Sequence, residues 1–178
     1  MTIIQETPIP DAYLISLERH VDERGFFSRT ICIDELAKYG IEFSVDQIST
    51  SYNRFKGTLR GMHYQQPMSP EIKIVRCTRG VIYDVVLDLR ITSPTYLNWI
   101  AFELSAQNGL AILVPEGCAH GFQTLRDDSE VLYTNSGQYE PAAAKTVRWN
   151  GHAFKSEWPD CNNRIMSNKD RDQPDFVA

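Results

Sequence analysis

The sequence has no long apolar run and no surplus of basic residues. Its 178 residues carry 18 Lys and Arg against 23 Asp and Glu, a net charge of −5. A nucleic-acid-binding face needs a basic patch or stripe, so we expect no nucleic-acid partner. No stretch approaches the roughly 20 apolar residues of a membrane span, and the first residues, MTIIQETPIP, lack the basic start and apolar run of a signal peptide. We therefore expect a cytoplasmic protein with no membrane association.

Paired cysteines are also missing. The four cysteines stand far apart in the chain, at Cys32, Cys77, Cys118 and Cys161. Disulfide frameworks and cysteine-rich zinc sites use closely spaced pairs, so this spacing indicates reduced thiols and no cysteine-bound metal. Helical patterns are rare as well. Only DELAKYG, residues 34–40, has one, with Asp34 as the expected N-cap and Gly40 at the end.

Short runs rich in Val, Ile, Tyr and Phe, separated by Gly, Pro, Asn or Asp, fill most of the chain. In the clearest run, GVIYDVVLDLR, the apolar positions from Val81 to Leu89 share one face, which we expect to pack in the core, and the other face is half polar because it carries Asp84 and Asp88. This pattern predicts an all-β fold, a double-stranded β-helix of the jelly-roll type with short peripheral helices. We expect a single domain over residues 1–178, with a polar segment at its end.

Two histidines follow glycine-containing turns, His63 in GTLRGMH and His120 in VPEGCAH. Their spacing resembles the two sequence motifs of the cupin fold. Metal-binding cupins usually have His-x-His and a nearby Glu, whereas this chain has His63-Tyr64-Gln65 with Glu71 displaced. Two imidazoles without a carboxylate are a poor ligand set for iron, manganese or zinc. We predict no metal site, and acid–base chemistry by the same histidines.

Other interpretations of the polar residues remain open at this point. Lys73 fits a lysine that protects an exposed edge strand, Tyr133 fits half-buried packing, and Asp170 fits a solvated residue. Strict alternation also places Arg60 and His63 on opposite faces of one strand. Both can reach one cavity only if Gly61, between them, bends or bulges the strand.

The chain resembles the dTDP-4-dehydrorhamnose 3,5-epimerase family of sugar-nucleotide enzymes over nearly its whole length. The matching stretches, in order, are DERGFF (22–27), GTLRGMHYQ (57–65), KIVRCTRGVIYDVVLDLR (73–90), VPEGCAHGFQTL (114–125), VLY (131–133), VRWN (147–150) and MSNKDRDQP (166–174). The resemblance implies a cupin jelly roll that works without metal or cofactor. It also implies a homodimer with exchanged N-terminal strands, and a C-terminal segment, from about residue 160, that packs back toward the site.

The same resemblance implies roles for individual residues. His63 is the expected base that removes a proton next to a ketone, Asp170 its carboxylate partner, Lys73 the cation beside the enolate, and Tyr133 the proton donor on the opposite face. The expected substrate is a nucleoside-diphosphate 4-keto-6-deoxyhexose, in deoxysugar biosynthesis. The residues implied to bind it are Arg24 from the neighbouring subunit, Phe27, Gln47, Arg60, His120 and Tyr139.

Several positions depart from the family pattern. Arg29 stands where an acidic residue is common, Gln138 where an aromatic ring is common, and alanines at 142–144 where polar residues are common. These changes leave the expected chemistry intact but bear on the choice of nucleotide and sugar. They keep open an enzyme that inverts only carbon 3 or carbon 5, a keto-isomerase, or a sugar-nucleotide-binding cupin without turnover.

Overall fold

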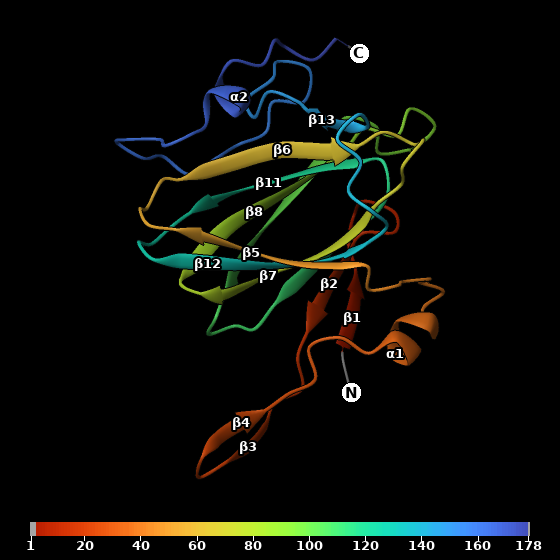
Figure 1. Ribbon diagram of the computed structural model, residues 1–178, viewed down its shortest axis with the longest axis vertical. Helices are drawn as coiled ribbons and strands as arrows, with labels where there is room; N and C mark the ends of the chain where they lie inside the picture. Colours follow the sequence, from red (N-terminus) through yellow and green to blue (C-terminus); the bar gives the residue numbers. More distant parts are fainter. Residues whose placement is uncertain (1–2, 178) are drawn as a thin grey trace.

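The computed structural model describes residues 3–177, which form two antiparallel β-sheets that face each other (Figure 1). The six-stranded sheet has the order β1 (Ile3–Glu6), β2 (Tyr13–Ser16), β10 (Ala111–Val114), β7 (Ile72–Arg79), β12 (Ser129–Ser136) and β5 (Gln47–Asn53). The five-stranded sheet has the order β13 (Ala144–Thr146), β6 (Leu59–Gln65), β11 (Cys118–Thr124), β8 (Val81–Asp88) and β9 (Trp99–Ser105). The predicted all-β architecture is confirmed.

The remaining elements are short and peripheral. A hairpin of β3 (His20–Asp22) and β4 (Gly25–Phe27) extends away from the sheets (Figure 1). The helices are α1 (Ile33–Ala37) and α2 (Asn168–Arg171). The N-cap of α1 is Cys32, so the prediction of Asp34 as the cap is wrong: Asp34 lies in the first turn, where a carboxylate favours the helix dipole. No helix in residues 3–177 is long and apolar enough to span a bilayer.

Both faces of β8 are covered, which corrects the interpretation of its sequence. Ile82 and Val86, on the supposedly half-polar face, lie in the core between the two sheets. Val85 and Leu87, on the other face, pack beneath the C-terminal part of the chain, with Phe154. The alternation separated the residues of β8 correctly into two faces. The half-polar face, which carries buried Asp84, is the one that packs against the opposite sheet.

The face between the sheets changes from apolar to polar along its strands. Toward one end, Cys77 on β7 pairs in register with Val131 on β12, and both are buried in the core. Two and four residues further along β12 on the same face stand Tyr133 and Asn135, with Lys73 as the register partner of Asn135. These three side chains line a cavity at this end of the sandwich.

The C-terminal segment returns to β6 and does not remain a free tail. The Leu59 N–H donates to the Ile165 carbonyl at 2.8 Å, which places the segment beside the start of β6. Ser167 then caps α2, because its hydroxyl accepts from the Asp170 N–H at 3.1 Å. The short helix holds Asp170 at 5% exposure against β6. Figure 1 shows α2 lying over β6.

Candidate active site

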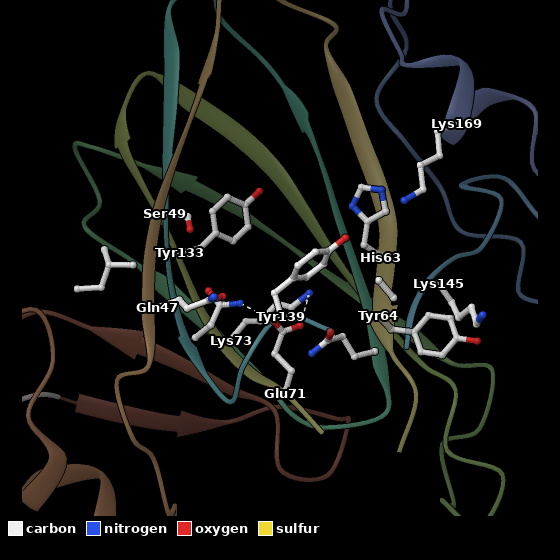
Figure 2. A pocket seen from close by; sticks show the side chains of 14 residues that line it. Gln47, Ser49, His63, Tyr64, Glu71, Lys73, Tyr133, Tyr139, Lys145 and Lys169 are labelled. Atoms are coloured by element: carbon white, nitrogen blue, oxygen red, sulfur yellow. Dashed lines mark hydrogen bonds and ion pairs between the residues drawn. The ribbon is translucent and has the colours of Figure 1, made fainter. Parts of the chain in front are cut away.

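The polar end of the sandwich contains a cavity of about 700 Å³ that adjoins a smaller one of about 270 Å³. The side chains common to both cavities are Ser49, His63, Lys73 and Tyr133. His63 comes from the five-stranded sheet and the other three come from the six-stranded sheet. In Figure 2, His63 and Tyr133 lie on opposite sides of the opening. The two sheets thus hold titratable groups on both sides of one space.

His63 is paired with a buried carboxylate from a distant part of the chain. Its Nε2 lies 2.7 Å from Asp170 Oδ1, while 42% of the His63 side chain is exposed. Burial raises the pKa of Asp170, but the hydrogen bond and charge of His63 and the Gly61 N–H outweigh burial, so this pKa lies below its ordinary value. An ionised Asp170 accepts a hydrogen bond from the Nε2–H of His63. When His63 carries a single proton, this bond favours that proton at Nε2 and leaves the Nδ1 lone pair free to take another.

Tyr133 faces His63 from β12 and is held by a second histidine. Its ring makes an edge-on contact with His120, with centroids 6.1 Å apart. His120 Nε2 in turn lies 2.8 Å from Oδ2 of Asp84, and both residues are buried. Burial and, to a smaller extent, the Asp84 charge raise the pKa of Tyr133 well above its ordinary value. The phenol is therefore protonated at neutral pH, the form that can donate.

Lys73 lies on the interior face, which excludes the edge-strand interpretation of this lysine. Its strand, β7, runs between β10 and β12 in the six-stranded sheet. The Lys73 ammonium lies 2.9 Å from Glu71 Oε2 and its side chain is 14% exposed. Glu71 Oε1 accepts a 2.6 Å hydrogen bond from the Asn135 amide. A cation is thus fixed at the floor of the cavity, below the space between His63 and Tyr133 (Figure 2).

Arg60 and His63 reach the same cavity because β6 bulges between them. His63 pairs with His120 and Arg60 with Phe122, so two residues of β6 stand opposite the single Gly121 of β11. Gly61 has φ +122°, and a Cβ there would lie 2.6 Å from the Gly121 Cα. Only glycine fits this position. The smaller cavity is lined by both Arg60 and His63, as the predicted bend requires.

Gln47 and Tyr139 line the larger cavity, and His120 lines the smaller one. Sequence reasoning missed Glu71, Asn135, Lys145 and Lys169, which also line the larger cavity. Figure 2 shows Lys169 reaching toward His63, whereas Lys145 points away from it. The sequence did contain a signal for a helix that includes Lys169, because Ser167 and Asp170 have the spacing of a helix-capping pair.

Arg24 and Phe27 do not reach either cavity of this chain. They lie on the projecting β3–β4 hairpin, where Arg24 bonds to Asp22 and Phe27 is 71% exposed. His20 and His152 are exposed and line neither cavity. Within residues 3–177, no group of three or more His, Cys, Asp or Glu side chains is arranged to hold a metal ion.

The geometry supports proton transfer on both faces of a bound molecule. A histidine with a free Nδ1 faces a protonated phenol, and an ammonium lies below the space between them, where an oxyanion could form. Removal of a proton next to a carbonyl needs these three functions: a base, a charge that stabilises the enolate oxygen, and an acid.

Comparisons with known proteins identify the family. A family model described as dTDP-4-dehydrorhamnose 3,5-epimerase matches residues 6–177. The dTDP-4-dehydrorhamnose 3,5-epimerase of Salmonella typhimurium is 37% identical over 177 residues, covering 98% of this chain and 95% of the relative. The crystal structure of the Bacillus anthracis enzyme of the same name, with TDP and PPi bound, has TM-score 0.94 and 36% identity, covering 99% of this chain and 100% of the other.

A 3′-monoepimerase from Streptomyces bikiniensis, in complex with dTDP-quinovose, has TM-score 0.88 and 29% identity, covering 96% of this chain and 86% of the other. The fold and these matches define the class of the protein: an isomerase built on a cupin jelly roll. Within that class, the chain belongs to the dTDP-4-dehydrorhamnose 3,5-epimerase family.

Asp170→Asn should partly disable the site. The amide keeps the shape of the carboxylate but carries no charge to hold the His63 proton at Nε2, so the imidazole becomes a weaker and less well oriented base. We expect proton exchange and epimerisation to fall together by about 10- to 100-fold, less than removal of the base itself. Both rates are measured by NMR on one reaction in deuterated water. Exposed Asp175→Asn, next to His152, is the matched control. Normal rates in Asp170→Asn would contradict the role of the pair.

Proposed function

We propose that the protein is a dTDP-4-dehydrorhamnose 3,5-epimerase that inverts carbons 3 and 5 of a nucleoside-diphosphate 4-keto-6-deoxyhexose. The observation that carries the proposal is the opposition of His63 and Tyr133 across one cavity, with Lys73 at its floor. Inversion at carbon requires removal of a proton from one face and delivery to the other. Two acid–base groups on the same side of a substrate could exchange a proton but not invert the centre.

Inversion of each carbon takes two proton transfers. His63 Nδ1 takes the proton from the carbon next to the ketone. The C–H electron pair forms a double bond between that carbon and carbon 4, and the electrons of the C=O double bond move to the carbon-4 oxygen, which gives an enolate. The Lys73 ammonium stabilises that oxygen. The Tyr133 hydroxyl then protonates the same carbon from the opposite face, and the ketone forms again. Water returns a proton to the Tyr133 oxygen and removes the one on His63, after which the second carbon reacts.

Cations near the reacting groups suit the diphosphate of the substrate. Arg60 lines the smaller cavity, where its Nε donates to Asn53 Oδ1 at 2.8 Å and leaves terminal N–H groups for phosphate. Lys169 reaches toward His63 from α2. The resemblance adds Arg24 from a second subunit, and the exposure of Arg24 and Phe27 on the β3–β4 hairpin supports such a homodimer. A role in cytoplasmic deoxysugar biosynthesis belongs to the same proposal.

Inversion at a single carbon is the second candidate. It is supported by the similarity to the 3′-monoepimerase and by Ala144, which lines the larger cavity where the family pattern has a polar residue. The experiment is turnover of a panel of dTDP- and UDP-linked 4-keto-6-deoxyhexoses, with product configuration assigned by NMR. Inversion at carbons 3 and 5 supports the proposal. Inversion at one carbon selects the monoepimerase, and nucleotide-sugar binding without turnover selects the binding module.

Activity should survive removal of metals. His63 and His120 each bind a carboxylate of the protein through Nε2, and the proposed steps use only side chains and water. Exhaustive dialysis against EDTA is expected to leave kcat within about twofold, since no step needs a Lewis acid. Metal content is checked by mass spectrometry on the same samples. Loss of turnover that a single ion restores would contradict the metal-free mechanism.

A further inference from the structure

We propose that Glu71, with Asn135, is a positioning residue that aims the Lys73 ammonium at the carbon-4 oxygen of the substrate. The inference rests on the proposed epimerase function, in which Lys73 stabilises the enolate. Neither Glu71 nor Asn135 has a part in the proton transfers themselves. Both line the larger cavity, and together with Lys73 they form a connected group on its floor.

The contacts of Glu71 leave it little freedom. One carboxylate oxygen lies 2.9 Å from the Lys73 ammonium, and the other accepts a 2.6 Å hydrogen bond from the Asn135 amide. Its side chain is 6% exposed. Lys73 and Asn135 are register partners on β7 and β12, so their side chains leave the sheet on the same face and side by side. The carboxylate joins the ends of these two neighbouring side chains.

This arrangement restricts a flexible side chain. A lysine has a four-carbon stem with many rotamers, and a carboxylate fixed at its far end selects among them. The ammonium has three donors, of which Glu71 takes one and two remain for the substrate. The negative charge also compensates for placing a cation where only 14% of the side chain is exposed.

The same contacts argue against Glu71 as the base that removes the substrate proton. Both of its oxygens are already bound within the protein, whereas Nδ1 of His63 has no hydrogen bond within the described chain. In Figure 2, Glu71 lies below Lys73, away from the space between His63 and Tyr133. Glu71 therefore acts on the reaction through Lys73.

Glu71→Gln tests the inference. The amide keeps the side-chain volume and one acceptor but loses the charge, so the ammonium is less firmly held. We expect kcat to fall about 10- to 100-fold, the cost of a misplaced group, while KM stays within about twofold because the nucleotide contacts are unchanged. Asn135→Ala, which frees one Glu71 oxygen, should change kcat in the same direction by less. The matched control is Glu130→Gln, a β12 carboxylate that accepts from the Thr78 hydroxyl outside the cavities.

A double variant separates positioning from independent action. In a Lys73→Ala background there is no ammonium to aim, so adding Glu71→Gln should change kcat by less than about twofold. The double variant should also have a higher thermal midpoint than Lys73→Ala alone, because Lys73→Ala leaves the Glu71 carboxylate buried without its cation. Losses that multiply in the double variant would overturn the inference, as would a normal kcat in Glu71→Gln. Absence of turnover in the wild-type protein would instead refute the proposed function.

Discussion

The His63→Ala variant is expected to exchange substrate hydrogen with solvent about 100 to 10,000 times more slowly than the wild type, because a general base usually contributes this factor. The fold should persist, because the side chain is 42% exposed and its removal leaves no closed cavity in the core. Nucleotide affinity should also persist, since the proposed phosphate contacts come from other residues. The measurement is deuterium incorporation at carbons 3 and 5 by NMR, with TDP binding by calorimetry on the same sample.

His152→Ala is the control for this experiment, because His152 is an exposed histidine that also pairs with a carboxylate, Asp175. It should exchange at the wild-type rate. If His63→Ala exchanged nearly normally, the base would have to lie elsewhere, and His120 would be examined first. His120 is the weaker candidate on geometry, because it is buried and its Nε2 is bound to Asp84.

Tyr133→Phe should separate exchange from inversion. The ring and its contact with His120 remain, but the proton donor on the far face is lost. His63 can still remove a proton and return a deuteron to the same face, so exchange continues. Inversion should fall about 100- to 10,000-fold, the range for loss of a general acid. The readout is the ratio of deuterium incorporation to epimer formation, which should rise far above the wild-type ratio.

The matched control is Tyr52→Phe, because the Tyr52 hydroxyl bonds to Asp128 on the exposed side of β5, outside both cavities. Its ratio of exchange to inversion should equal that of the wild type. An equal loss of exchange and inversion in Tyr133→Phe would contradict a donor that acts only on the second face. That result would assign Tyr133 a part in proton removal as well.

Much of the fold follows from local patterns in the sequence. Alternating apolar residues and glycine-containing turns predicted the strands, because a strand that faces a core needs this period of two. The faces of β8 were harder to assign, since the sandwich covers one side and the C-terminal segment covers the other. Local sequence does not say what packs over a strand. Composition likewise indicated a tail where Ser167 caps a helix that carries a buried carboxylate.

The site was predictable only where a pattern or a resemblance joined distant residues. His63 and Asp170 are 107 positions apart, and no period or spacing connects them. The bulge at Gly61 was predictable from the sequence, because strict alternation would have placed Arg60 and His63 on opposite faces. Glu71 was considered only as a metal ligand and rejected. Its position two residues before Lys73, hence on the same side of the strand, was a signal for the ion pair that the structure shows.

The central claim is that base and acid act from opposite faces of one sugar. It is tested most directly by wild-type turnover of a dTDP-4-keto-6-deoxyhexose in deuterated water, with label position and configuration followed by NMR. The account predicts one deuteron at carbon 3 and one at carbon 5, each on an inverted centre. Inverted product without solvent label at either carbon would contradict it, because a proton taken by His63 and one given by Tyr133 must both pass through groups that exchange with water.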